Sequence, residues 1–505
     1  MKAAKPTKSL KHSAVAGAFW SALSTVFSRG LRFMITIFLA RVLAPEDFGL
    51  IAMSMVVIDV AEMLRDLGLG AALIQRKQLD PEHLTTCFWA NMGIGLSLWA
   101  ITTAISPLAA DFYRNPSVAP ILRVMALNFL ISPFGSIPWV MLNRQLRFRE
   151  LMIAQSVATA IRGGASLLLA FKGFGVWSLV WGPIAGNLAG AVINEWFCRW
   201  QPKFAWSQRH FMDLFHFGKN IFGERLLGYF AGNSSFLITG RFLGAEIVGF
   251  YNFAYQIPHL AETQIVPVVG RVLLPVLSQV QDDHERLRRG YLQSLRWIAA
   301  VCAPFAAGLC VVAPEFVHIV YGQRWTPVVV PLQILCLAGF VHALTNTVWT
   351  VQQAVGRSDI GFKWNAATLP FIIGGLIASA RWGMLGIALV MTLMSVVLAI
   401  AIQHITNRLI GLSWRRWLAT VRAPVLSSAL MAGITALLRL WLLSRGPSTL
   451  VLLLATTIAG TFTLILFLFM LDRTMLDDLL HIFDRRKAPV PQPAFEPEPG
   501  TYANP

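Results

Sequence analysis

Long stretches of apolar residues alternate with short polar segments along almost the whole chain. Most stretches reach the roughly 20 residues that an α-helix needs to cross the hydrocarbon core of a bilayer. Fourteen are present, at about residues 13–41, 48–67, 84–108, 119–141, 150–171, 174–197, 213–239, 245–275, 290–312, 326–351, 360–380, 383–404, 420–442 and 448–471. The pattern predicts an all-α integral membrane protein with about fourteen transmembrane helices.

One short segment occurs twice. ARVLAPEDFGLI stands at residues 40–51 after the first apolar stretch, and GRFLGAEIVGFY stands at residues 240–251 after the seventh. Pairing each position from 41 to 74 with the position 200 residues later gives eight identities without a gap, which are Arg41/Arg241, Leu43/Leu243, Glu46/Glu246, Gly49/Gly249, Ala61/Ala261, Glu62/Glu262, Gly70/Gly270 and Leu73/Leu273. Coincidence between two apolar helix hairpins is the alternative, but we favour an internal duplication.

The duplication predicts an architecture, because the repeat is six helices long. An even number gives the two copies the same orientation, related by a pseudo-two-fold axis along the membrane normal. The predicted parts are a cytoplasmic tail (1–12), an N-lobe of helices 1–6 (13–211), a C-lobe of helices 7–12 (212–410), helices 13 and 14 (411–472) and a cytoplasmic tail (473–505). From about residue 488 the tail is rich in proline and polar residues, which predicts disorder.

Composition and charge agree with a membrane protein. The chain has 56% hydrophobic and only 13% charged residues, whereas soluble domains carry about 25% charge. A net charge of +17 would indicate nucleic-acid binding in a soluble protein, but 27 of the 42 Lys and Arg residues fall in segments on the same side as the N-terminus and 8 on the opposite side. This asymmetry predicts that both termini are cytoplasmic and accounts for most of the charge without nucleic acid.

Catalytic signatures are missing from the sequence. No segment between predicted helices is long enough to fold as a separate domain, and no P-loop, nucleophile elbow or HExxH motif is present. The five cysteines lie in or beside apolar stretches without metal-ligand spacing, so they predict neither disulfides nor a metal site. We therefore expect no enzyme, no catalytic residue and no cofactor.

Charged residues inside the apolar stretches need an explanation, since each costs roughly 2.5–3.5 kcal/mol at a helix centre. Arg29 and Arg32 continue a Ser/Thr stripe along one face of helix 1. Polar groups also gather in helices 2, 7 and 8. The cations expected to line a cavity between the lobes, and so to bind substrate, are Arg29, Arg32, Arg65, Lys219, Arg225 and Arg271.

The acids in these helices have two interpretations. Asp59, Glu62, Glu224 and Glu262 could carry a coupling ion, or they could form structural ion pairs such as Glu62 with Arg29. Cations outnumber these acids, so the cavity suits an anion, and arginine in particular suits a phosphate or pyrophosphate through bidentate hydrogen bonds. Structural pairing remains the alternative for the arginines as well.

Proline and glycine interrupt two of the polar helices. Helix 8 contains Pro258, Pro267 and Gly270, and helix 2 runs into Gly68 and Gly70. Such residues mark bends, where freed backbone groups find other partners beside a cavity. Two lobes that rock about a cavity would make an alternating-access transporter.

Two segments carry a family resemblance. LARVLAPEDFGLIAM and DLGLGAALIQRK resemble the Wzx-type polysaccharide and O-antigen flippases, in the colanic-acid-exporter-like branch of the multidrug/oligosaccharidyl-lipid/polysaccharide exporter superfamily, over roughly residues 13–475. The resemblance implies a multi-pass protein of the bacterial inner membrane that flips an undecaprenyl-pyrophosphate-linked oligosaccharide repeat unit. A polysaccharide polymerase and a chain-length regulator would be further partners.

Lipid II flippases, which are more distant relatives, use cavity arginines on helices 1, 2 and 8 for the lipid diphosphate. The resemblance would give that role to Arg29, Arg32, Arg65 and Arg271. For Lys219 and Arg225 on helix 7, the assignment to the substrate site rests on the charge argument alone. Two alternatives stay open. A multidrug exporter of the same superfamily would have twelve helices and an acidic cavity, and a glycan polymerase or ligase would have a long outer loop.

Overall fold

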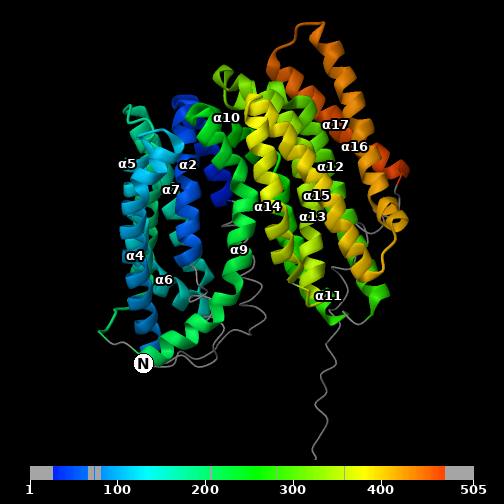
Figure 1. The fold of residues 1–505 in the computed structure, drawn as a ribbon. Coiled ribbons are helices and arrows are strands. Elements are labelled where there is room, and N and C mark those ends of the chain that lie inside the picture. Colours follow the sequence, from blue (N-terminus) through cyan, green and yellow to red (C-terminus); the bar gives the residue numbers. More distant parts are fainter. Residues whose placement is uncertain are drawn as a thin grey trace, which may run out of the picture.

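The computed structural model describes residues 27–65, 73, 81–204, 207–280, 283–357 and 359–471 of the chain. Within these ranges, the side chains at 81, 209–225, 265, 268, 271, 272, 275 and 276 are outside the description. The described residues form helices and connecting turns and no strand. In Figure 1 the helices stand side by side, with their axes roughly along one direction.

The helices follow one another with short connections. A first helix spans residues 27–42. The others are α2 (Pro45–Arg65), α4 (Pro81–Tyr113), α5 (Val118–Met125), α6 (Asn128–Arg144), α7 (Phe148–Phe171), α8 (Trp177–Cys198), α9 (Gln208–Leu243), α10 (Ala245–Gln256), α11 (Leu260–Gln279), α12 (His284–Val320), the 3₁₀ helix η1 (Gln323–Val328), α13 (Val329–Ala354), α14 (Asp359–Ala380), α15 (Gly383–Ile410), α16 (Trp414–Leu443) and α17 (Thr449–Leu471).

Over its described residues, each of the fourteen predicted spans coincides with a helical segment. Within the described ranges, nine of these segments are long and apolar enough to cross a membrane. The other five predicted spans coincide with the first helix, α2, α8, α9 and the α10–α11 pair. The predicted fold class, an all-α multi-pass membrane protein, is therefore confirmed. The two predicted tails, 1–12 and 473–505, lie outside the described residues.

Helix 8 is broken where its sequence predicts a bend. It consists of α10 and α11, which are separated at Ile257–His259, because Pro258 has no backbone N–H to continue the helix. The backbone of α11 then continues through Pro267 and Gly270. The corresponding glycines of helix 2, Gly68 and Gly70, lie outside the described residues.

The helices pack as two groups that meet along a central seam. α4 to α8 pack against one another, as do α11 to α15, and Figure 1 shows these groups on the left and right. α2, α9 and α10 lie between them, with α2 packed against both α9 and α10. This arrangement has the form of two pseudo-symmetric lobes, while the lobe limits at residues 13, 211 and 410 stay predictions.

α16 and α17 lie at one edge of the molecule (Figure 1). α16 packs against α12, and Arg439 of α16 forms an ion pair with Glu315 of α12 at 2.8 Å. Glu315 is buried, and the pair supplies the charge that this carboxylate needs away from water. The terminal helix pair is thus attached to the second group of helices.

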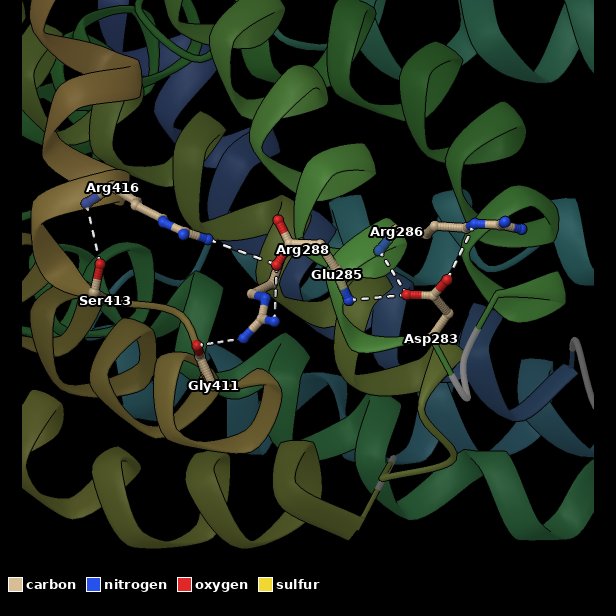
Figure 2. A network of polar contacts seen from close by, with 7 residues as sticks. All are labelled: Asp283, Glu285, Arg286, Arg288, Gly411, Ser413 and Arg416. Atoms are coloured by element: carbon tan, nitrogen blue, oxygen red, sulfur yellow. Dashed lines mark hydrogen bonds and ion pairs between the residues drawn. The ribbon is translucent and has the colours of Figure 1, made fainter.

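A second set of contacts attaches α16 at the other end of α12 (Figure 2). Arg288 donates to the carbonyl oxygen of Gly411 at 2.7 Å, and Arg416 lies 3.6 Å from the carboxylate of Glu285. Asp283 caps α12 by accepting from the backbone N–H groups of Arg286 and Glu285, at 3.0 and 3.1 Å. The N–H of Arg286 is the main cause of a lowered pKa of the Asp283 carboxyl.

Candidate functional site

A polar cavity lies in the first half of the chain. It has a volume of about 570 Å³ and is enclosed by α2, α4, α6, α7 and α8. Polar groups from all five helices line it, among them Glu62, Arg65, Asn91, Asn128, Arg162 and Asn187. The cavity therefore combines two arginines and several amides with a single acid among its described lining residues.

Arg65 reaches this cavity from the last turn of α2. Its Nη2 lies 2.6 Å from Oε2 of Glu62, three residues earlier on the same face of the helix, and its Nη1 donates to Ser132 Oγ. The side chain is 24% exposed. The ion pair of Glu62 found here is with Arg65, instead of the pair with Arg29 considered from the sequence, and Arg65 can still reach a ligand.

Arg162 reaches the cavity from α7. Its Nη2 donates to Oδ1 of Asn187 at 2.7 Å, and Nδ2 of Asn187 donates in turn to Asn128 Oδ1 at 2.9 Å. In the described part of the chain, no carboxylate forms an ion pair with it. Two amides thus orient this guanidinium without neutralising its charge.

Arg29 and Arg32 lie on the exposed part of the first helix. Neither guanidinium has a hydrogen bond or ion pair among the described residues. Ile35, one turn after Arg32, packs at Gly163 of α7, and the positive charges of Arg32 and Arg162 interact. Arg32 therefore belongs to the same cationic region as the cavity.

Asp59 has a partner across the seam. Its Oδ2 accepts a hydrogen bond from the hydroxyl of Tyr229 on α9, at 3.1 Å. This contact joins α2 to α9 and favours the structural interpretation for this acid. The helical backbones of α9 and α11 include Lys219, Glu224, Arg225 and Arg271, but these four side chains lie outside the description.

A second cavity lies in the other half of the chain. Its volume is about 310 Å³, and α9, α11, α13, α14 and α15 enclose it. Glu262 lines it and accepts a hydrogen bond on Oε1 from Asn346 Nδ2 at 3.1 Å. Glu62 and Glu262, an identical pair of the duplication, thus each line the cavity of their own half. The described cavities lie inside the halves, and the predicted cavity between the lobes stays a prediction.

The duplicated segments meet where α2 and α10 begin, which we call the gate end. A Cβ added to Gly49 would overlap the carbonyl oxygen of Ala245, and one added to Gly249 would overlap that of Pro45. Positions 45 and 245 are themselves a pair of the 200-residue repeat, so the contact is reciprocal. Only glycine allows the two helices to approach this closely.

Two arginines of the duplication make a matching reciprocal contact at the gate end. Arg41 donates from Nε to the carbonyl oxygen of Val320 at 3.1 Å and from Nη2 to that of Ile319, at the end of α12. Arg241 donates to the carbonyl oxygen of Phe112 at 2.8 Å, near the end of α4. Helix C-termini attract cations, and each arginine binds a helix from the other half.

Trp325 fills the space behind these contacts. Its side chain is fully buried, and its Nε1 donates to the carbonyl oxygen of Ala40 at 2.8 Å. Its ring centroid lies 5.6 Å from that of Phe48 and 4.3 Å from that of Phe253. The gate end is therefore closed by tight helix packing, hydrogen bonds and aromatic rings.

The first cavity lies away from the gate end along α2. The gate contact is made by Gly49 in the first turns of α2, whereas Glu62 and Arg65 occupy its last turn. With the topology predicted from the Lys and Arg distribution, the gate end faces outward and the cavity lies toward the cytoplasmic side.

Sequence reasoning left Arg162 and its amide partners out of the candidate site. Arg162 was noticeable as an arginine within an apolar stretch, but helix 5 shows no further charge pattern. Asn128 and Asn187 lie on two other helices, and only the packing of α6, α7 and α8 brings them to Arg162.

Comparisons with known sequences place the chain among polysaccharide biosynthesis proteins. Residues 38–330 match the family described as "Polysaccharide biosynthesis protein". Lipopolysaccharide biosynthesis protein WzxC of Escherichia coli (strain K12) is 29% identical over 82% of this chain and 85% of its own. Teichuronic acid biosynthesis protein TuaB of Bacillus subtilis (strain 168) is 30% identical over 81% and 83%, and succinoglycan biosynthesis transport protein ExoT of Rhizobium meliloti (strain 1021) is 24% identical over 93% and 95%.

Solved structures share the fold. The lipid II flippase MurJ in an inward closed conformation superposes with a TM-score of 0.73 at 14% identity, over 91% of this chain and 100% of that one. An inward-facing multidrug resistance transporter of the MATE family, in the MOP superfamily, superposes with a TM-score of 0.63 at 13% identity, over 78% of this chain and 98% of that one. At such identities the likeness concerns the fold alone.

Proposed function

The chain belongs to the polysaccharide biosynthesis protein family, and on this premise we propose that it moves an undecaprenyl-pyrophosphate-linked oligosaccharide repeat unit across a bacterial inner membrane. The observation that carries the proposal is the cationic cavity of the first half, with Arg65 and Arg162 in its wall. The descriptions of the relatives support it, since they name the biosynthesis of three cell-surface glycans, and one names transport.

The charge of the cavity suits the diphosphate of the carrier lipid. Arg162 is oriented by Asn187 and forms no ion pair with a described carboxylate, Arg32 adds a second cation nearby, and Arg65 forms an ion pair with Glu62. Guanidinium groups bind phosphate oxygens through paired, charge-assisted hydrogen bonds. A diphosphate entering from water would exchange part of its hydration for these donors.

The remaining lining suits the sugars. Asn91, Gln155 and Asn194 present amide groups, which both donate and accept hydrogen bonds, as sugar hydroxyls require. Trp139 also lines the cavity and is 46% exposed. Its flat apolar ring offers a surface to the C–H face of a pyranose, while the lipid tail remains in the bilayer.

Transport by this fold requires the gate end to open. The two halves must separate at Gly49 and Gly249, and Arg41 and Arg241 must release the helix ends of the opposite half. The cavity would then face outward while the opposite end closes, which is the alternating-access scheme that two rocking lobes make possible. No covalent step is needed, because the substrate leaves unchanged.

The topology and partners follow from the same proposal. Both termini would lie in the cytoplasm, as the 27 to 8 distribution of Lys and Arg indicates. A polysaccharide polymerase and a chain-length regulator would receive the repeat unit in the outer leaflet. Because the fold is shared with a multidrug transporter, the two arginines of the lining, Arg65 and Arg162, are the feature that favours a lipid diphosphate over a drug.

Replacing Arg162 tests the role of the cavity. Arg162→Ala removes a charged donor and should lower export roughly ten- to a hundredfold, the value of one hydrogen bond to an ion. Arg162→Lys keeps the charge without the bidentate geometry, so part of the export should remain. The readout is surface polysaccharide in a strain whose own flippase gene is deleted, with membrane protein measured in parallel.

Arg123→Ala is the matched control. Arg123 also stands in a predicted span, is exposed and donates to Ser106 on α4, away from the cavity. Export should be unchanged in this variant. Equal export by the Arg162→Ala and Arg123→Ala variants would remove Arg162 from the substrate site.

A further inference from the structure

Three side chains gather at the break of helix 8, outside the arginine-lined cavity. His259 directly precedes α11, Glu262 stands in the first turn of α11, and His342 lies on α13. One ligand atom from each of the three lies within 4.8 Å of the others. The cluster combines residue types that bind metal ions, and the role proposed for the arginine-lined cavity does not involve it.

His259 presents a lone pair with no partner. Its Nδ1 lies 2.7 Å from the carbonyl oxygen of Tyr255, and since a carbonyl only accepts, Nδ1 carries the proton. Nε2 is then the basic nitrogen. It is buried without a hydrogen-bond partner, on a side chain that is only 5% exposed. The ring is also held by stacking on Tyr255, with centroids 4.0 Å apart.

The tautomer of His342 follows from a similar argument. Its Nε2 lies 2.9 Å from Ser395 Oγ, and that hydroxyl donates its only hydrogen to the carbonyl oxygen of Met391 at 2.7 Å. His342 must therefore donate from Nε2, which leaves the lone pair on Nδ1. An imidazole with one nitrogen held by an outer partner and the other left basic is the usual arrangement of a metal-binding histidine.

Glu262 adds the negative charge. Its Oε1 accepts a hydrogen bond from Asn346, and within the described residues the carboxylate forms no ion pair. A carboxylate in a membrane helix is costly without a compensating cation. Glu262 is thus held in orientation by Asn346, and within the described residues no cation compensates its negative charge.

From this geometry we propose that His259, Glu262 and His342 bind a divalent transition-metal ion of the zinc class. Two imidazoles and one carboxylate are a known ligand set for zinc, with a fourth position left for water. Tetrahedral ligands stand about 3.3 Å apart at zinc–nitrogen distances of about 2 Å, so the three side chains need to close by an ångström or so. Imidazole ligands favour such an ion over sodium or magnesium.

The ion has a route to the site. Glu262 and His342 both line the cavity of about 310 Å³ in the second half of the chain. Ser395, which orients His342, lines it as well. A hydrated ion could enter there and keep one water as its fourth ligand.

A bound ion would restrain the bend of helix 8. It would tie the start of α11 to α13, next to the break at Pro258, where a Cβ added to Gly339 of α13 would lie 2.8 Å from the Pro258 carbonyl oxygen, so the two backbones are closely packed. If α11 moves during transport, the metal-bound protein transports more slowly than the metal-free one. Binding itself does not depend on the proposed transport function, so the two can fail separately.

The experiment is a metal titration of the purified full-length protein without a histidine tag. After treatment with a chelator, zinc is titrated by calorimetry, and cobalt(II) serves as a second probe whose visible absorption reports tetrahedral coordination. We expect one ion per chain. His342→Ala should weaken binding more than a hundredfold, and Ser395→Ala, which removes the outer partner, about ten- to a hundredfold.

Two further variants make the result decisive. Glu262→Gln keeps the size of the side chain and should also weaken binding strongly, so the proposal remains testable if a histidine variant fails to fold. His404→Ala is the control, because His404 stacks on Trp414 away from the cluster and should bind zinc normally. Absence of stoichiometric binding, or equal affinity in the parent and in the His342→Ala and Glu262→Gln variants, would overturn the site.

Discussion

Export should fall to background in the Gly49→Val and Gly249→Val variants. The added Cβ of either residue would overlap a backbone carbonyl oxygen of the facing helix, which cannot move aside as a flexible side chain can. Overpacking of this kind typically costs about 1–3 kcal/mol, and here it acts on the contact that closes the gate end. The variants should therefore be held with this end open, and surface polysaccharide in a strain lacking its own flippase would show the loss.

A cysteine in place of Phe48 reports on the gate itself. Phe48 is 8% exposed at the closed seam, so a membrane-impermeant maleimide added outside should label Phe48→Cys only when Gly249→Val is also present, in a background without native cysteines. Gly164→Val is the control, because nothing lies within 4 Å of a Cβ added there. Normal export by both gate variants would show that this crossing does not take part in transport.

The Arg29→Ala, Arg32→Ala double variant should also lose nearly all export. The two arginines have no described ion pair, and Arg32 lies in the field of Arg162, so together they can compensate a diphosphate. Each charge-assisted hydrogen bond contributes about 1.5–3 kcal/mol, and the loss of several corresponds to a decrease of more than a hundredfold. Surface polysaccharide is the measurement, normalised to membrane protein.

Two further double variants show whether a loss of export comes from lost hydrogen bonds to the diphosphate, from lost positive charge or from poor folding. The corresponding double lysine variant keeps both charges and should retain partial export. The Arg381→Ala, Arg445→Ala variant removes two exposed arginines from the turns after α14 and α16 and should export normally. Undiminished export by a stable double alanine variant would leave Arg29 and Arg32 without a role in binding.

The fold could be predicted from the sequence because hydrophobicity dominates in a membrane. The fourteen apolar stretches coincide with the α-helices of the described residues, and Pro258 located the break in helix 8. The helix ends differ from the predicted spans. The helix α12 runs from His284 to Val320, beyond the predicted 290–312, because a helix can continue into water on polar residues that hydropathy does not count. Helix 4 divides into α5 and α6 at Ala126 and Leu127 without a proline at the break.

The glycines and arginines of the gate end are identical pairs of the repeat in the sequence, but only the structure shows that they contact the opposite half. A pseudo-two-fold axis brings together those equivalent residues of a repeat that lie close to it, and Gly49 and Gly249 were marked by their identity before their contact was known. Arg41 and Arg241 were marked in the same way, but their bonds to the ends of α12 and α4 depend on helices far away in the chain.

The cavities were harder to predict, because they are assembled from helices that share no local pattern. Glu62 and Arg65 stand three residues apart, and their ion pair is visible in the sequence. Arg162 needs Asn187 from the next helix, and His259 needs His342 from two helices further on. Spacing rules cannot find ligands that only tertiary packing brings together.

Reconstitution of the purified protein tests the central claim most directly. Lipid-linked repeat units extracted from the organism that encodes the chain would be incorporated into the vesicles, and a membrane-impermeant glycosidase would measure how many reach the outer leaflet. We predict protein-dependent exposure of the undecaprenyl-pyrophosphate-linked oligosaccharide that the Arg29→Ala, Arg32→Ala variant does not support. Exposure no faster than in protein-free vesicles, with the protein folded and inserted, would contradict the account.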